Sequence, residues 1–143
     1  MRGLTVLGAV LAAQAAVAPP PQPPASLVVG EIGEQTFTGD FTCPVDEICM
    51  RYPALTSFGK ARTLSGPVLP VRFPARIWLH MGIAKGAMLA IIVQPRADGR
   101  FEVRAWTALQ NGEACLPSAI VDATRLRLPD ETVSDGDNRC FRL

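Results

Sequence analysis

The sequence predicts an all-β domain, and three observations lead to that fold class. Residues 75–81 and 101–109 alternate between apolar and polar side chains, which is the two-residue period of a half-buried strand. Between them, residues 88–93 hold a nearly unbroken apolar run, as expected for a strand that is buried on both faces. No segment shows a convincing long amphipathic helix. Five to seven short strands are therefore expected, arranged as a small barrel or, alternatively, as a β-sandwich.

The N-terminus has the pattern of an export signal. Arg2 is the only charged residue before an apolar run over residues 4–17. That run is shorter than the roughly 20 residues of a membrane-spanning helix, but it suits the core of a signal peptide. Small residues allow cleavage after Ala15 or after Ala18. We therefore expect residues 1–15 to be a signal peptide and the protein to be exported, to a periplasm or out of the cell. The alternative is an uncleaved N-terminus that stays disordered or tethers the protein to a membrane.

The charge balance argues against one large class of binding protein. Cleavage after Ala15 would remove Arg2 and no acidic residue, so 13 of the 14 basic residues would face 13 acidic ones. A net charge of zero argues against a nucleic-acid binder, which would show a marked basic excess. Residues 16–25 contain the sequence PPPQPP and are expected to form a flexible, extended arm. Residues 26–143 are expected to form a single β domain without a transmembrane segment.

The four cysteines predict two disulfides, because an even number of cysteines behind an export signal is typical of disulfide-bonded domains. Three connectivities are possible. We favour the local pairs Cys43–Cys49 and Cys115–Cys140, since each pair lies in one segment outside the central strands. A zinc site is not expected, because the chain has no C-x-x-C pair and only one histidine. No glycine-rich phosphate loop opens a helix, so no nucleotide or other cofactor is expected.

The N-terminal half of the domain is predicted segment by segment. Residues 27–32 are expected to form the opening strand, because they combine apolar side chains with a glycine that suits a bulge. A disulfide between residues 43 and 49 favours a tight loop over a helix, since residues six apart lie on different helix faces. Residues 52–66 are punctuated by proline and glycine, so only residues 61–64 predict a short strand there.

The C-terminal half contains two strong turn signals and one further candidate strand. Asp98-Gly99 predicts the turn between two central strands, and Asn111-Gly112 predicts a turn after them. Residues 125–128 alternate and predict a last strand. Residues 129–138 are polar and predict a loop, after which the terminal residues 140–143 are expected to be tied down by their disulfide.

The order of several stretches carries a further indication. A Val- and Gly-rich opening strand is followed by Leu-Ser-Gly at residues 64–66, by KGAMLAIIV at 85–93 and by GRFEV at 99–103, and Cys115 comes soon after. Over about residues 27–115 the chain resembles the netrin-module and tissue-inhibitor-of-metalloproteinase type of OB barrel. The resemblance implies a five-stranded OB barrel. Together with the favoured cysteine pairs, it leads us to expect a small five- to six-stranded OB-like barrel with a disulfide-tethered loop and C-terminal segment. In the inhibitor branch a cysteine at the mature N-terminus chelates the protease metal. No cysteine precedes Cys43 here, so that mechanism is not carried over.

No catalytic or metal-binding constellation stands out. His80 is the only candidate base, and the candidate nucleophiles Ser57, Ser65 and Ser118 are not part of a G-x-S-x-G elbow. Residues 135–138 (DGDN) resemble half of a calcium loop but lack the ordered ligands and the closing glutamate, so a polar turn is expected. The sequence therefore predicts no catalytic residue and no metal site.

One face of the central strands is the predicted binding surface. The core faces are expected to carry Ile77, Leu79 and Met81 on one strand and Phe101, Val103 and Ala105 on the other. The opposite faces then present Trp78, His80, Arg104 and Trp106, together with Arg76 and Glu102. Tryptophan and arginine are enriched in binding hot spots, and large exposed apolar groups need a reason. The alternative is that a loop or the C-terminal segment covers this face.

The sequence thus predicts an exported, non-enzymatic binding module of the cell envelope, whose partner is a protein or another envelope component. Trp78, His80, Arg104 and Trp106 are its predicted partner surface. One alternative is an inhibitor of a secreted hydrolase or protease that presents the Cys43–Cys49 loop to an active site. A second alternative is a small hydrolase that uses His80.

Overall fold

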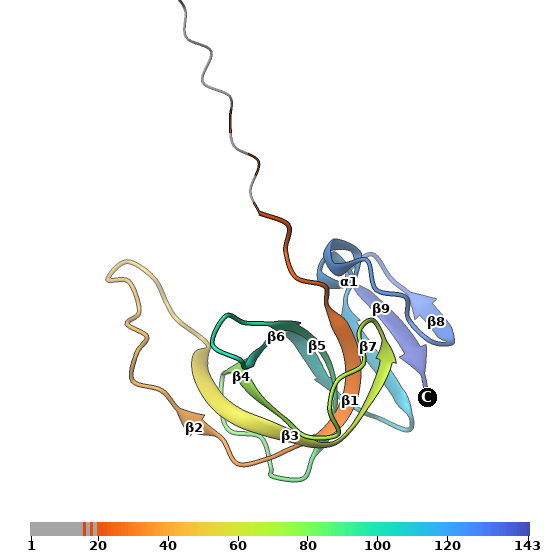
Figure 1. Ribbon diagram of the computed structural model, residues 1–143, viewed down its shortest axis with the longest axis horizontal. Helices are drawn as coiled ribbons and strands as arrows, with labels where there is room; N and C mark the ends of the chain where they lie inside the picture. Colours follow the sequence, from red (N-terminus) through yellow and green to blue (C-terminus); the bar gives the residue numbers. More distant parts are fainter. Residues whose placement is uncertain (1–15, 17, 19) are drawn as a thin grey trace, which may run out of the picture.

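Five strands close into a barrel in the computed structural model, which describes residues 16, 18 and 20–143 (Figure 1). They are β1 (Ser26–Ile32), β3 (Tyr52–Ser65), β4 (Phe73–Leu79), β5 (Met88–Pro95) and β6 (Phe101–Ala108). The hydrogen-bonded order is β1-β5-β6-β4-β3, and β1 pairs in turn with β3, which closes the barrel. The expected signal peptide lies outside the described residues.

The topology decides between the two predicted architectures. Every neighbouring pair in the barrel is antiparallel except β4 and β6, which run parallel. A small closed Greek-key barrel with this strand order is of the OB type. The all-β prediction and the OB-like barrel are confirmed, and the sandwich alternative is not. The predicted central strands over residues 75–109 correspond to β4, β5 and β6.

β3 is the longest strand, although its residue pattern predicted it least well. β3 runs unbroken through residues 52–65, where only a short strand over residues 61–64 was predicted. It first pairs with β4 and then with β1, and its two register shifts against β1 let it wrap around the barrel. Lys60 has a left-handed backbone with φ 49° and lies at the second of these shifts, between the pairs Val29–Arg62 and Glu31–Gly59. The strand ends at Ser65, and the following Gly66 has a positive φ of 82° at a point where a Cβ atom would clash with the carbonyl oxygen of Ala25.

Two hydrophobic clusters explain why β5 is apolar throughout. Leu89, Ile91 and Val93 point into the barrel, where they pack with buried side chains from the other four strands. Ala90 and Ile92 point outward into a second cluster, which the C-terminal residues complete. Each face of β5 is therefore buried against a different part of the protein, as the continuous apolar run predicted.

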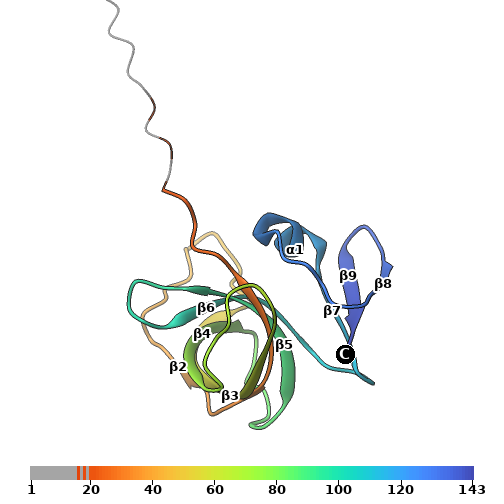
Figure 2. The same cartoon turned by 45° about the vertical axis from the view of Figure 1, so that its right-hand side comes forward.

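The C-terminal residues form a small unit that packs on the outside of the barrel (Figure 2). It contains β7 (Glu113–Pro117), the short helix α1 (Ser118–Thr124), β8 (Glu131–Ser134) and β9 (Asn138–Arg142), with sheet order β7-β9-β8. Leu116, Val121 and Phe141 are buried in the second cluster.

Two predictions about this C-terminal unit are wrong. Residues 125–128 do not form a strand, because Arg125 takes a left-handed conformation that ends α1 and leads into an irregular stretch. Leu126 and Leu128 still alternate because both are turned toward the second cluster. Residues 129–138 are not simply a loop, since they contain β8, which is held by pairing with β9 rather than by an apolar pattern.

The predicted core faces also need two corrections. Met81 is 68% exposed, because β4 ends at Leu79 and the chain bends away after it. Ala105 belongs to the outer cluster and not to the barrel interior. The cause is a bulge in β6: Val93 pairs with Val103 but Ile92 pairs with Ala105, so an extra residue reverses the direction of every later side chain.

A disulfide closes each of two segments outside the barrel strands. Cys43 is bonded to Cys49 in the long connection between β2 (Thr36–Phe37) and β3. The residues between the two cysteines form a tight loop and not a helix, as expected. Cys115 is bonded to Cys140, and the two residues face each other across the β7–β9 ladder. Both local pairs that the sequence favoured are therefore present, and they fit an oxidising compartment. Among the described residues, no helix has the length and apolar character needed to cross a bilayer.

Candidate functional site

Trp78 lies on the outer face of β4, as its alternation with Ile77 and Leu79 predicts. Its indole N–H donates a 2.8 Å hydrogen bond to Oε1 of Glu102 on the neighbouring strand β6. The other carboxylate oxygen of Glu102 accepts a 2.6 Å bond from Nη1 of Arg96. This bond raises the pKa of Arg96. The guanidinium of Arg76 lies 5.1 Å from the centre of the Trp78 ring system. Trp78 is thus held in one orientation by contacts on two strands.

Trp106 closes a gap in the barrel wall. β4 and β6 pair only at Ala75–Phe101 and Arg76–Glu102, and beyond these residues the two strands separate. The bulge in β6 turns Trp106 toward the barrel, where it packs against the inner cluster. Its indole nitrogen lies 3.4 Å from the backbone carbonyl oxygen of Trp78, at a position of β4 that is not paired with β6. Trp106 therefore fills the seam, although simple alternation placed it on the outer face.

The two tryptophans and Arg104 border one hollow of about 350 Å³. Arg51 lines another part of it, and Pro117 and Ile120 of the C-terminal unit complete it. Both indoles are half-buried and Arg104 is exposed. The predicted face is thus neither open nor fully covered, since the C-terminal unit flanks the hollow without filling it. The structure brings together three of the four predicted binding residues.

His80 is the residue that the structure separates from this group. It follows the end of β4 and is exposed, and its Nδ1 lies 2.7 Å from the backbone carbonyl oxygen of Met50. Because a carbonyl oxygen can only accept, Nδ1 carries the proton of this hydrogen bond. No serine hydroxyl or carboxylate is among its hydrogen-bond partners in the part of the chain that the structure describes.

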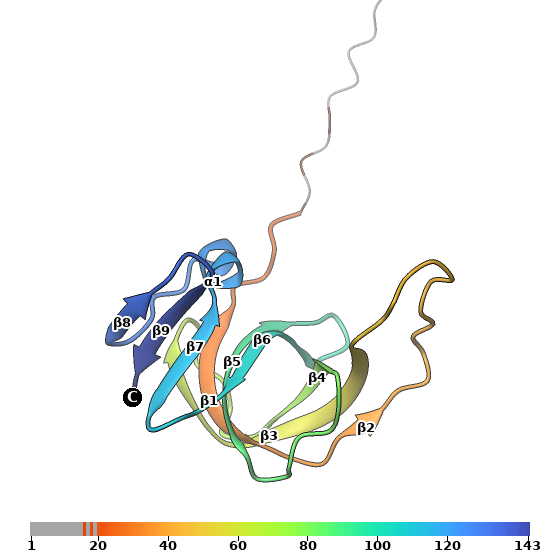
Figure 3. The ribbon, with the colours of Figure 1, turned by 180° about the vertical axis from the view of Figure 1, so that it is seen from behind.

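The loop closed by Cys43–Cys49 stands next to the tryptophan hollow. Phe41 packs edge-on against Trp78 with ring centres 5.1 Å apart, and it also contacts Tyr52 at 6.2 Å. On the other side of the disulfide, Met50 accepts the hydrogen bond from His80. Both ends of the loop are therefore attached to the barrel, while its middle projects away from it (Figure 3).

The tip of this disulfide loop exposes two apolar side chains. Val45 is 101% exposed and Ile48 is 90% exposed, and Asp46 and Glu47 lie between them. Neither apolar side chain belongs to either hydrophobic cluster. Sequence reasoning identified the loop but did not predict Phe41 as its anchor, because only the tertiary structure brings Phe41 to Trp78.

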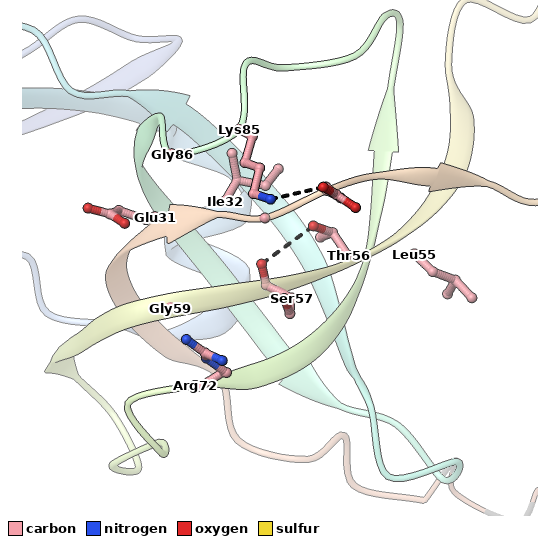
Figure 4. Close-up of a pocket in the computed structure, with 11 residues that line it drawn as sticks. Glu31, Ile32, Leu55, Thr56, Ser57, Gly59, Arg72, Lys85 and Gly86 are labelled. Atoms are coloured by element: carbon pink, nitrogen blue, oxygen red, sulfur yellow. Dashed lines mark hydrogen bonds and ion pairs between the residues drawn. The ribbon is translucent and has the colours of Figure 1, made fainter.

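A wider hollow of about 620 Å³ lies between β1, β3 and the connection that precedes β5 (Figure 4). Its charged side chains are mostly paired: Lys85 binds Glu34 at 2.9 Å, and Glu31 binds Lys60 at 2.7 Å. The bond from Lys85 lowers the pKa of Glu34. The backbone passes close by at Gly33, where a Cβ atom would lie 2.9 Å from the hydroxyl of Ser57. Paired charges in an open groove give little basis for a specific ligand.

The suspected calcium segment is a polar turn. Oδ1 of Asp135 accepts hydrogen bonds from the backbone N–H groups of Asp137 at 3.0 Å and Asn138 at 2.7 Å. This arrangement is an Asx-type turn, in which the carboxylate stabilises its own backbone. In the described part of the chain, one cluster of three metal-type ligands occurs, formed by Glu113, Cys115 and Cys140. Its two sulfur atoms form a disulfide, so they offer no thiolate to a metal.

Comparisons with protein-family models, with curated proteins and with solved structures find no match for this chain. The OB-type topology rests on the strand pairing alone. The resemblance to the netrin-module and metalloproteinase-inhibitor barrels stays a prediction.

Proposed function

We propose that this protein is an exported, non-enzymatic interaction module of the cell envelope that binds a protein partner. The hollow of Trp78, Arg104 and Trp106 would receive a side chain or segment of the partner, and the adjacent disulfide loop would extend the contact. The observation that carries the proposal is the pair of half-exposed indoles held rigidly beside an exposed arginine. Tryptophan and arginine in a preformed hollow have the composition of a binding hot spot.

The location of the hollow supports the same proposal. In OB barrels, ligands commonly bind on the face of the second and third strands and on the loops beside it. Here the second and third barrel strands are β3 and β4, and Trp78 and the disulfide loop occupy that face. This support is an analogy at the level of the fold. The balanced charge of the domain favours a protein over a nucleic acid as partner.

The test is co-purification from the native cell envelope. We expect one protein to be retained by the wild type and lost by the Trp78→Ala/Trp106→Ala variant. Because Trp106 also packs against the barrel interior, a second variant is needed that leaves the fold intact. Arg104→Glu changes only an exposed side chain and should weaken retention as well. Val68→Ala/Val71→Ala, in an exposed loop elsewhere, is the matched control and should retain the partner. Retention of the same partner by all variants would refute the proposed surface.

A second candidate function is inhibition of a secreted hydrolase. The specific observation in its favour is the nearly complete exposure of Val45 and Ile48 on a disulfide-closed loop, a shape that can enter an active-site cleft. Inhibition of an envelope protease by the wild type, with loss of inhibition in Cys43→Ala/Cys49→Ala, would support this function. The absence of inhibition against a panel of serine, cysteine and metalloproteases from the same compartment would count against it.

A further inference from the structure

The tryptophan hollow carries positive charge that has no counter-charge within the molecule. Arg51 and Arg104 line it, and of the described residues no acidic side chain does. Both arginines are exposed, and neither forms an ion pair in the described part of the chain. The carboxylate of Glu102, on the same strand as Arg104, already accepts hydrogen bonds from Trp78 and Arg96. The hollow therefore combines aromatic walls with two cations that an acidic ligand would match.

The tip of the disulfide loop has the complementary composition. Its sequence over residues 45–48 is Val-Asp-Glu-Ile, so two acidic residues stand between two apolar ones. All four residues are exposed. Neither Asp46 nor Glu47 takes part in an ion pair among the described residues. The tip thus presents two carboxylates and two aliphatic side chains, which match the two guanidinium groups and the apolar walls of the hollow.

The loop tip has a defined shape before any contact is made. The disulfide Cys43–Cys49 closes the loop, and the backbone N–H of Glu47 donates a 3.1 Å hydrogen bond to the carbonyl of Pro44. This bond forms a turn with Val45 and Asp46 at its centre. A preorganised segment loses less conformational entropy when it binds. The hollow, at about 350 Å³, is small for a ligand site, so it suits the few side chains of such a turn.

The loop does not occupy the hollow of its own molecule. Phe41 packs against Trp78 at one end of the loop, and the carbonyl of Met50 accepts a hydrogen bond from His80 at the other. Both ends are therefore fixed to the barrel, and the middle projects away from it (Figure 3). The two apolar side chains of the tip are accordingly almost fully exposed. A loop tip of this kind can reach the hollow only from a second molecule.

We propose that the partner is a second copy of this chain, whose disulfide-loop tip enters the hollow. This inference rests on the proposed function, because it uses the same hollow and names its occupant. The loop and the hollow adjoin at Phe41 and Trp78, so each molecule offers both halves of the contact. Two copies then exchange loops about a two-fold axis, which closes the dimer. In this dimer the two loop carboxylates of one molecule pair with Arg51 and Arg104 of the other, and the apolar side chains of the tip contact its indoles.

The test is sedimentation velocity of the disulfide-bonded protein over a wide range of protein concentration. We expect a monomer–dimer equilibrium that weakens as salt is added, because the contact depends on surface charges. Asp46→Arg/Glu47→Arg and Arg51→Glu/Arg104→Glu should each weaken the dimer at least about 10-fold, since each variant sets like charges against one another. All four positions are exposed, so both variants should keep their fold.

An equal mixture of these two variants is the decisive measurement. In the mixed dimer, one contact joins an unchanged loop to an unchanged hollow. The other contact joins a loop and a hollow that both have reversed charge, so opposite charges meet again. The affinity of the mixed dimer should therefore return to nearly that of the wild type. A loss of association that came from damage to the fold would not be repaired by mixing.

Arg62→Glu/Arg72→Glu is the matched control, because it reverses two exposed arginines that do not line the hollow. It changes the net charge as much as Arg51→Glu/Arg104→Glu does, and it should dimerise as the wild type does. A wild type that stays monomeric at every concentration would overturn the inference, and so would a mixture that associates no better than its components. The proposed function is tested separately. It still holds if co-purification finds a different envelope protein that the wild type retains and Arg104→Glu does not.

Discussion

The two disulfides of this protein lie in regions of opposite character. Cys115–Cys140 joins two paired strands of the C-terminal unit, whose side chains Leu116 and Phe141 are fully buried against the barrel. Cys43–Cys49 closes a loop that contributes nothing to either hydrophobic cluster and exposes Val45 and Ile48 instead. The same covalent bond therefore serves two purposes. In the C-terminal unit it reinforces a packed structure. In the loop it limits the conformations of a tip that the rest of the described chain leaves exposed.

Truncation of one apolar side chain in each region should give the largest difference in the free energy of unfolding. Phe141→Ala removes a fully buried ring from the cluster between barrel and C-terminal unit, so unfolding should require about 3–5 kcal/mol less free energy. Ile48→Ala, at the exposed loop tip, should change stability by less than about 0.5 kcal/mol. Urea unfolding monitored by tryptophan fluorescence measures both. A small effect of Phe141→Ala would mean that the C-terminal unit is not part of the cooperative fold.

Removing each disulfide in turn should give a smaller difference in stability loss between the two regions. Cys115→Ala/Cys140→Ala opens a 25-residue connection and should lower stability by about 3 kcal/mol, because the unfolded chain gains conformational freedom that the folded sheet does not. Cys43→Ala/Cys49→Ala should lower it by less than about 1 kcal/mol, since the loop gains freedom in both states. The loop variant should instead become sensitive to limited proteolysis between residues 43 and 49. Equal losses of stability in the two variants would contradict the difference between the packed C-terminal unit and the exposed loop.

The smallest predicted effect is a difference in acid sensitivity. Two hydrogen bonds from the guanidinium of Arg139, at 2.6 and 2.9 Å, hold the pKa of Glu131 below its usual value. A carboxyl whose pKa is lower in the folded state stabilises the protein at pH values above its unfolded pKa of about 4.3. This contribution is lost as the pH falls through the folded pKa. Glu131→Gln should therefore lower the urea midpoint at pH 7 and match the wild type near pH 2.

Glu47→Gln in the disulfide loop is the control for this experiment. Glu47 is exposed and no ion pair involves it in the described part of the chain, so the variant should follow the wild type across the whole pH range. If Glu131→Gln also follows the wild type at every pH, the bidentate pair with Arg139 does not contribute to stability. Surface ion pairs often contribute little, which is why this effect is placed last.

Part of the candidate site could be predicted from the sequence, and the limits have physical causes. Trp78 was correctly placed on the outer face because β4 alternates regularly from Phe73 to Leu79. Trp106 was placed on the same face, but the bulge at Arg104 reverses the alternation before it is reached. A bulge depends on how two strands pair, and pairing partners lie far apart in the sequence. For the same reason, the contact of Phe41 with Trp78 and that of Met50 with His80 left no signal in the residue pattern.

Residue patterns were sufficient to predict the all-β class, the strands of residues 75–109, the Asp98-Gly99 turn and the favoured disulfide pairs. These features depend on local alternation, on residues that tolerate unusual backbone angles, and on short distances along the chain. Three other features could be seen only in the folded protein: residues 52–65 form one long strand, β8 joins the C-terminal sheet, and Trp106 fills the seam between β4 and β6. Each of these depends on a hydrogen-bonding partner from a distant part of the chain, and such a partner is set when the barrel closes.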